Sequence, residues 1–129
     1  MAVTRLEDAV AGFIEAWNVD DDGKRLRLLE SVCRADAVFV SPQGITTGCG
    51  PMCASIGAFR RAFPRARVVA GSADRHHGYV RFRWTTIWND GRPDLSGDDF
   101  AALDADGRIR ELASFDGRPR DPEDPPAAG

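Results

Sequence analysis

The chain has 129 residues, a mass of 14.0 kDa and a formal net charge of −3, with 17 Lys and Arg against 20 Asp and Glu. This length fits one domain with a real core. The basic residues are scattered rather than gathered in a patch, so no nucleic-acid partner is expected. No apolar run reaches 18 residues, which predicts no transmembrane helix.

The N-terminus and the cysteines bear on the cellular compartment. The chain begins with an amphipathic helical pattern, not with a charged and then apolar leader, so no signal peptide is evident. Its three cysteines, Cys33, Cys49 and Cys53, cannot all pair internally, which fits a reducing environment. The sequence therefore predicts a cytoplasmic protein.

Helical periodicity dominates the first half of the chain. A first helix ends before Asn18–Gly23, a second short one follows, and a third begins at Gly50-Pro51, because proline suits the first helical turn. The segment 36–42, which lies between the second and the third of these helices, is predicted to be a strand that ends at Pro42. Residues 44–50 are predicted to be a loop. The apolar positions that define the helices are Leu6, Val10, Phe13, Ile14 and Trp17, then Leu26, Leu29, Val32 and Cys33, then Met52, Ile56, Phe59 and Phe63.

After residue 65 the pattern changes to period two. This pattern predicts four sequential strands at residues 67–74, 79–88, 94–103 and 108–115. Turns at 77–78, 89–91 and 106–107 join them. Helices followed by an antiparallel meander predict an α+β domain over residues 1–116. The segment 117–129 is rich in Pro, Gly and charge, and is predicted to be a disordered tail.

One acid in the third of these strands is the main candidate for chemistry. Asp99, Ala101 and Leu103 share a face because strand side chains alternate, and Leu103 marks that face as the inner one. The preceding strand carries Phe82 and Trp84 in the same alternation, so the carboxyl is expected to point into an aromatic cavity. Such a cavity raises the pKa of an acid, and Asp99 is predicted to act as a proton donor or relay. The alternative is a carboxylate satisfied by a backbone or indole donor, or facing solvent.

Several further groups carry both a functional and a simpler interpretation. His76 and His77 lie at a turn, where one of them can lean over the pocket mouth as a base or both can be surface residues. Cys49 and Cys53 flank the start of the third helix. Three interpretations are open for them: reactive thiols, a disulfide, or reduced residues that only pack. Arg81 and Arg83 alternate with the inward aromatics, so they face outward, toward solvent or a dimer interface. No zinc spacing and no phosphate-binding glycine loop occurs, so neither a metal nor a cofactor is predicted.

Three segments, in order, resemble the nuclear transport factor 2-like superfamily, which includes SnoaL-type polyketide cyclases and ketosteroid isomerases. They are residues 13–18 (FIEAWN), residues 36–44 (DAVFVSPQG) followed by Gly48, and Gly97-x-Asp99 followed by 103–109 (LDADGRI) and Phe115. The resemblance covers about residues 5–117. It implies a curved antiparallel sheet wrapped around about three helices, a cone-shaped pocket and a homodimer.

The resemblance also implies roles for single positions. Asp99 matches the late-strand acid of the ketosteroid isomerases, which the low polarity of its surroundings keeps neutral. The position of their base holds Ser41, and the position of their catalytic Tyr holds Phe13. Because neither residue can replace the original one in acid–base catalysis, steroid-type proton shuttling in the familiar arrangement is not expected.

Three hypotheses for function remain open. The first is an isomerase- or cyclase-like enzyme acting without a cofactor on an apolar polyketide- or steroid-like substrate, with Asp99 and His77 as the catalytic residues. The second is a non-catalytic ligand-binding domain, and the third is a structural dimerisation module. The residues predicted to contact an apolar small molecule are Phe13, Trp17, Phe39, Ser41, Ile56, Phe59, Phe82, Trp84, Trp88 and Phe115.

Overall fold

The computed structural model describes residues 6–119, 121 and 122. Residues 120 and 123–129 of the predicted tail lie outside these ranges. The described elements are α1 (Leu6–Ala16), α2 (Asp22–Val32), β1 (Cys33–Ser41), β2 (Gly44–Thr47), α3 (Cys49–Ala62), β3 (Arg67–His76), β4 (Tyr79–Ile87), β5 (Leu95–Leu103) and β6 (Ile109–Asp116). None of the helices within the described residues has the length and apolar character needed to cross a membrane.

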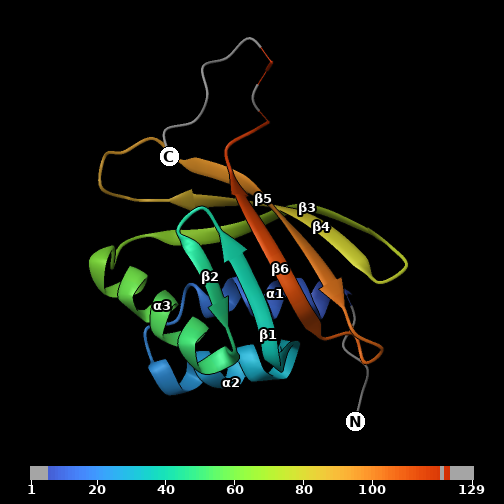
Figure 1. The fold of residues 1–129 in the computed structure, drawn as a ribbon. Helices are drawn as coiled ribbons and strands as arrows, with labels where there is room; N and C mark the ends of the chain where they lie inside the picture. The colour runs from blue at the N-terminus through green and yellow to red at the C-terminus, as the bar shows by residue number, and fades with distance from the viewer. Residues whose placement is uncertain (1–5, 120, 123–129) are drawn as a thin grey trace.

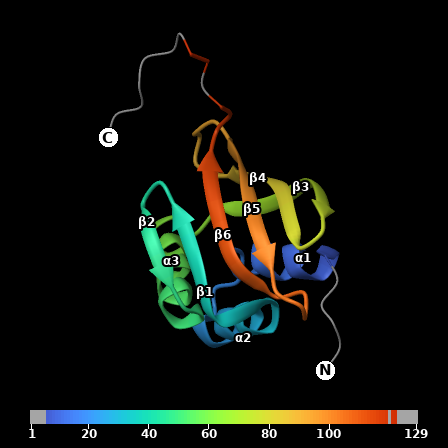
Figure 2. The same cartoon turned by 45° about the vertical axis from the view of Figure 1, so that its right-hand side comes forward.

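The strands form one curved sheet in the order β2-β1-β6-β5-β4-β3, and the three helices pack on one of its faces (Figures 1 and 2). This arrangement confirms the α+β class and the meander β3–β6. The sheet is mixed rather than wholly antiparallel, because β1 pairs with β6 in parallel. The last strand of the meander, β6, therefore lies beside β1, the strand that belongs to the helical half of the chain.

The segment 44–50 is not the loop that the sequence predicts. Residues Gly44–Thr47 form β2, which pairs with β1 through a hairpin closed by Ser41 and Gly44. Gly44 has a φ of 145°, which glycine adopts at little cost. The strand has only four residues and no alternation of burial, so its sequence carries little periodic signal.

The break after α1 is a turn that caps α2. The Asp21 side chain accepts a hydrogen bond from the Lys24 backbone N–H at 2.7 Å and caps α2. Asn18 joins α1 to the edge of the sheet, because its amide donates to the Val68 carbonyl at 2.7 Å and accepts from the Val68 N–H at 2.8 Å. The turn therefore sets both the start of α2 and the position of α1 against β3.

Two buried arginines hold the helical layer together. Arg25 on α2 donates to the carbonyls of Ala16, the last residue of α1, and Val19 in the turn that follows. Arg60 on α3 donates to Asp20 and to the carbonyls of Pro64 and Ala66, which begin the connection to β3. Both buried guanidinium groups donate to backbone carbonyls, so they act as fixed hydrogen-bonding centres for the loops.

Candidate functional site

Asp99 lies on the inner face of β5, under the helices. Its side chain is buried, with 4% of the residue exposed, and Ala101 and Leu103 follow it on the same face with 5% and 9% exposed. The predicted orientation of this strand is therefore confirmed. Directly beside Asp99 in the register lie Phe82 on β4 and Ser114 on β6.

Two side-chain donors hold the Asp99 carboxyl. The Trp84 indole Nε1–H donates to Asp99 Oδ1 at 2.9 Å, and the Ser114 hydroxyl forms a second hydrogen bond. Burial raises the pKa of Asp99 from its ordinary value of 3.8 to about 6, while the bonds from Ser114 and Trp84 oppose the rise. Both protonation states are therefore populated near neutral pH.

Gly97 explains how the Trp84 indole reaches the carboxyl. A Cβ at Gly97 would lie 2.3 Å from Trp84 Cζ2 and 2.1 Å from the Phe115 carbonyl oxygen. The indole therefore lies against the bare backbone of β5, one inward position from Asp99. Any larger residue at this position would displace the ring from its hydrogen-bonding geometry.

Ser114 is the site residue that sequence reasoning missed. It shares the alternation of Leu112, which is 2% exposed, and it pairs with Asp99 across β5 and β6. The alternation of the predicted strand 108–115 allows Ser114 to face inward, and its pairing with Asp99 decides that it does. On β1, Ser41 follows the inward Phe39 by two residues, about 10 Å from Asp99 across two strand spacings. Its hydroxyl donates to Gln43 Oε1 at 3.2 Å instead.

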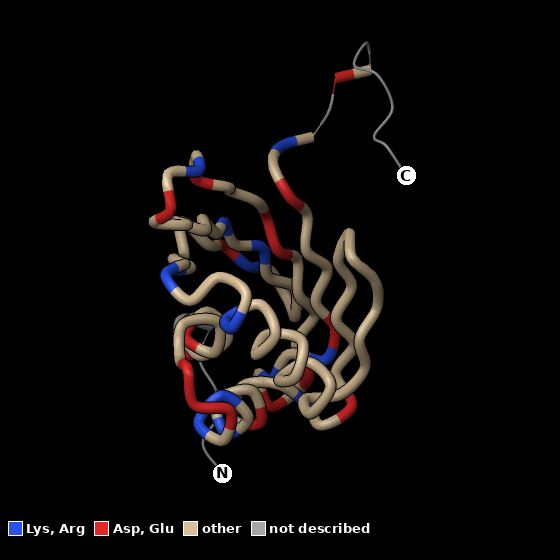
Figure 3. The backbone as a smooth tube through the Cα atoms, turned by 90° about the vertical axis from the view of Figure 1, so that its left-hand side faces the viewer, with Lys and Arg blue, Asp and Glu red and all other residues tan. Residues whose placement is uncertain are grey.

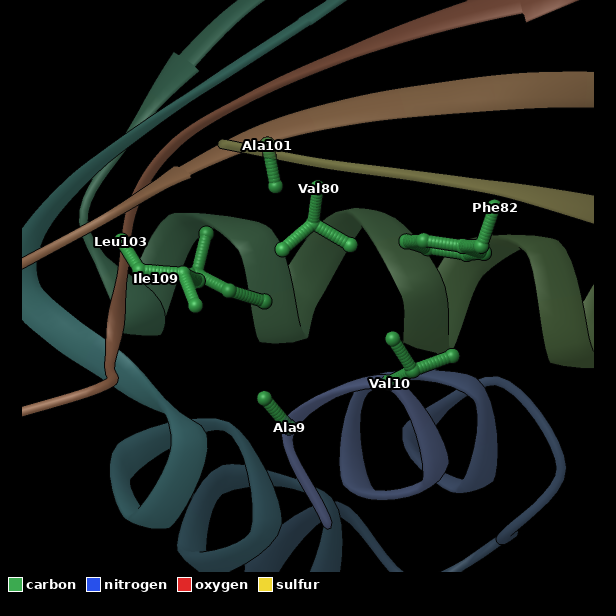
Figure 4. A pocket seen from close by; sticks show the side chains of 7 residues that line it. All are labelled: Ala9, Val10, Val80, Phe82, Ala101, Leu103 and Ile109. Carbon is green, nitrogen blue, oxygen red and sulfur yellow. The ribbon is translucent and has the colours of Figure 1, made fainter. Parts of the chain in front are cut away.

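The space beside Asp99 is apolar and closed. Seven side chains from α1, β4, β5 and β6 point toward one another there and leave no space for a water molecule (Figure 4). The inner face is thus filled by side chains at this point of the sheet. Phe82 lines this closed region and also pairs with Asp99, so its ring lies where the apolar region meets the carboxyl. The lining residues are Ala9, Val10, Val80, Phe82, Ala101, Leu103 and Ile109.

The residues predicted to contact a ligand fall into three places. Phe13, Phe39, Ile56 and Phe82 are core residues, and Phe13 stacks on Phe39 with ring centroids 6.1 Å apart. A second cluster at the end of α3 joins the half-buried Trp17, Phe59 and Trp88 to Phe63 and Arg92. Phe115 lies on the outer face and is 58% exposed, because it alternates with the inward Ser114. The prediction that Phe115 lines the pocket is therefore wrong.

His77 does not lie beside Asp99. It occupies the exposed turn between β3 and β4 with a φ of 55°, and its Nδ1 is 3.3 Å from the Nδ1 of His76. Phe82, the partner of Asp99, lies five positions further along the chain on β4, which corresponds to roughly 16 Å along a strand. The structure thus places the second predicted catalytic group away from the first.

The three cysteines are buried free thiols. Burial raises the pKa of Cys33 to about 12 and raises the pKa of Cys49 as well. The Cys49 thiol donates to the Arg34 carbonyl and the Cys53 thiol to the Asp22 carbonyl. The three cysteines are therefore reduced side chains in the packed interior, and no disulfide joins them.

Acidic and basic residues alternate along the part of the chain that the structure describes. Figure 3 shows acidic and basic residues interspersed along the backbone of both layers. Among the residues that the structure describes, no group of three or more His, Cys, Asp or Glu side chains has the arrangement of a metal site. The site around Asp99 therefore consists of one acid, two hydrogen-bond donors and an apolar wall.

Comparison with solved structures identifies the family. No family model matches the chain, and no curated protein matches it. A protein of the SnoaL-like family from Agrobacterium tumefaciens, proposed to be an isomerase, is 30% identical, with a TM-score of 0.78 over 85% of this chain and 95% of that one. A protein from Jannaschia sp. CCS1, proposed to be a SnoaL-like polyketide cyclase, is 18% identical, with a TM-score of 0.70 over 86% and 83%.

A third structure shares the fold at lower identity. It is a nuclear transport factor 2-like protein of unknown function from Exiguobacterium sp. 255-15, 18% identical, with a TM-score of 0.68 over 84% of this chain and 98% of that one. At this identity the likeness concerns the fold alone. The identity and coverage of the Agrobacterium protein go further, and the chain belongs to the SnoaL-like family.

Proposed function

We propose that the inner face of the sheet binds a small apolar molecule that carries a carbonyl or hydroxyl group, and that Asp99 exchanges a proton with it. The reaction class is isomerisation or cyclisation of a polyketide- or steroid-like compound. The observation that supports this most is a carboxyl 4% exposed, with a pKa of about 6, beside an apolar wall. Solved relatives proposed to be isomerases or polyketide cyclases support the same class.

The chemistry follows from the protonation of Asp99. The carboxylate takes a proton from a carbon next to the substrate carbonyl, and the resulting acid returns it to another carbon of the same molecule. A pKa near the working pH suits both steps, because the group must bind and release the proton in turn. Trp84 and Ser114 keep the carboxyl oriented between the two steps.

Binding requires the inner face to open. The closed apolar region has no space for a water molecule, so a ligand must displace side chains, and Phe82 is the ring that separates this region from Asp99. A phenylalanine ring needs only side-chain rotation to move. The observed affinity is therefore expected to equal the affinity of the open form multiplied by the fraction of molecules that are open.

A second candidate function is ligand binding without catalysis. Its specific support is that Trp84 and Ser114, the side chains that hydrogen-bond to Asp99, are not bases at neutral pH. Ser41 at the position of the isomerase base, and His77 on a distant exposed turn, add no second acid–base group. In this alternative, Asp99 contributes a hydrogen bond to the ligand and nothing more.

Two assays separate these functions. The first follows conversion of 3-cyclohexen-1-one to its conjugated isomer by ultraviolet absorbance, and the second follows 2-naphthol binding by the fluorescence of the tryptophans. Proton transfer by Asp99 predicts measurable conversion that falls by about 100-fold or more in Asp99→Asn. The matched control is Asp106→Asn, which removes an exposed carboxyl from the β5–β6 turn and should leave the rate unchanged.

Each outcome decides between the candidates. Conversion that depends on Asp99 but not on Asp106 supports the enzyme. Binding of 2-naphthol that Asp99→Asn weakens, without conversion by the parent protein, supports the non-catalytic alternative. Neither conversion nor binding at the solubility limit of the probes contradicts both proposals.

A further inference from the structure

Two histidines meet on the turn between β3 and β4, which projects from the sheet at the right of Figure 1. They are His76, the last residue of β3, and His77, the first residue of the turn, and the chain has no other histidine. Both are exposed, and their Nδ1 atoms lie 3.3 Å apart, with the two ring planes at 85°. Two imidazole nitrogens therefore lie side by side on an exposed surface.

The backbone of His77 brings the two rings together. Adjacent side chains of a strand point to opposite faces, so two neighbouring histidines in regular strand geometry would diverge. The turn has two residues, because His76 pairs with Tyr79, and His77 adopts a φ of 55° in the left-handed region. Glycine adopts this region most readily, yet His77 occupies it and the adjacent Gly78 does not. This conformation breaks the alternation and turns the ring of His77 toward that of His76.

The separation of the two nitrogens is that of two ligands on one tetrahedral metal ion. Zinc binds imidazole nitrogen at about 2.0–2.1 Å, and two such bonds at the tetrahedral angle place the nitrogens about 3.3 Å apart. A direct hydrogen bond between the rings is the alternative, but 3.3 Å is long for a bond that an N–H group donates. It also requires a proton on one Nδ1 and none on the other. A shared ion therefore fits this geometry better than a direct bond.

Bonds to neighbouring residues hold the turn in place. The Gly78 carbonyl accepts a hydrogen bond from the Leu103 N–H at 2.7 Å, which joins the turn to the end of β5. The Arg75 guanidinium donates to the His77 carbonyl at 3.3 Å. Because the backbone already has the conformation that brings the rings together, an ion has to order only two side chains, and the entropy lost on binding is small.

We propose that His76 and His77 together bind one Zn²⁺ ion through their Nδ1 atoms, with water in its remaining positions. In the part of the chain that the structure describes, no third His, Cys, Asp or Glu side chain joins them. The ion thus has fewer protein ligands than a structural zinc ion and is expected to exchange with solvent. Imidazole suits zinc, whereas Mg²⁺ and Ca²⁺ prefer oxygen ligands. The positive charge of Arg75 beside the pair further disfavours cations that are held by charge alone.

The zinc site is separate from the acid on the inner face. His77 lies five positions along the chain from Phe82, the partner of Asp99, which corresponds to roughly 16 Å along a strand. The proposed ion joins the end of β3 to the turn that leads into β4, and it does not reach the Asp99 carboxyl. The inference therefore does not depend on what the inner face binds or on whether Asp99 transfers a proton.

Titration of the whole chain with ZnCl₂, followed by NMR of the imidazole nitrogens and by calorimetry, tests the inference. We expect one Zn²⁺ per chain, with the Nδ1 signals of both histidines shifting together, and no shift with MgCl₂. His77→Asn removes one ligand, and asparagine tolerates the left-handed backbone. This variant and His76→Gln should each weaken binding by about 10-fold or more, because the second bond of a chelate forms at a high effective concentration. Circular dichroism checks that each variant remains folded.

Tyr79→Phe is the matched control for these variants. It removes the phenol oxygen of the ring beside His76, where the two ring centroids are 6.3 Å apart, and should leave the zinc affinity unchanged. If each histidine still binds Zn²⁺ with the same affinity after the other is replaced, the two bind independently and the shared ion is wrong. Imidazole signals that do not move at millimolar Zn²⁺, or that MgCl₂ moves equally, would likewise overturn the inference.

Discussion

At the scale of single residues, Asp99 combines burial with a partial set of hydrogen bonds. Its carboxylate receives the Trp84 indole N–H and the Ser114 hydroxyl, yet burial still raises its pKa to about 6. The nearby Asp98 and Asp116 carboxylates raise the pKa further. The protein thus keeps at its inner face an acid whose ionised form is disfavoured, which is a state typical of groups that exchange protons.

This pKa makes the stability of the fold depend on pH in a defined direction. The folded state binds the proton of Asp99 more tightly than the unfolded chain, so this group stabilises the fold most at low pH. Its contribution is lost as pH rises from about 4 through about 6. The difference between 3.8 and about 6 corresponds to about 3 kcal/mol of unfolding free energy.

Urea unfolding of the parent and of Asp99→Asn between pH 4 and pH 8 measures this loss. The parent should lose about 3 kcal/mol relative to the variant across that range, because only the parent must ionise a buried group. Titration of the Asp99 carboxyl carbon by NMR gives the pKa independently. If the unfolding free energies of the parent and of Asp99→Asn change with pH in the same way, and Asp99 titrates at its ordinary pKa, burial does not raise the pKa of Asp99.

At the scale of the elements, buried arginines connect the helices to the loops that follow them. The side chain of Arg60 is 2% exposed and reaches Asp20 at 2.9 Å and the Pro64 carbonyl at 3.0 Å, so it fixes the turns at both ends of the helical layer. Its neighbour Arg61 carries the same chemistry but is 67% exposed and lies 3.7 Å from Asp22. The two adjacent positions thus form a matched pair for one experiment.

Replacing each arginine by methionine keeps the aliphatic stem and removes the donors. Arg60→Met should cost about 1–3 kcal/mol of unfolding free energy, since the carbonyls of Pro64 and Ala66 lose a buried partner. Arg61→Met should change it by less than about 0.5 kcal/mol, as is usual for exposed positions. Equal effects of the two variants in chemical denaturation would show that burial of Arg60 does not determine its contribution.

At the scale of the whole molecule, one layer of helices on one curved sheet leaves every cysteine on the covered side. Cys33, Cys49 and Cys53 are 1%, 4% and 8% exposed, and burial raises the pKa of the Cys33 thiol to about 12. Because the thiolate is the reactive form, native thiols are expected to be inert. Access then requires the layers to separate.

Alkylation with iodoacetamide measures that separation, when mass spectrometry counts the alkylated cysteines. The native protein should label slowly, and all three thiols should react together once urea unfolds the chain. A labelling rate that rises with urea in step with the circular dichroism signal supports a cooperative opening. Rapid labelling of one cysteine in the native state would instead identify a locally open segment.

The sequence alone was sufficient for the local features of this fold. Helical spacing located the three helices, and alternation placed Asp99, Ala101 and Leu103 on the inner face and Arg81 and Arg83 on the outer one. These predictions succeed because the spacing of apolar residues indicates which face of a helix or strand is buried. A few adjacent residues are enough to define that face. The four-residue β2 is too short to carry such a record.

Only the tertiary structure decided what surrounds each of these faces. The parallel pairing of β1 with β6, the closure of the apolar region by α1, and the exposure of His77 all depend on contacts between segments far apart in the chain. Phe115 shows the same limit, because the parity of one strand has meaning only once Ser114 is paired with Asp99. The sequence determined which residues face inward, whereas packing across the layers determined that the interior is closed and that the exposed aromatics lie on the opposite face.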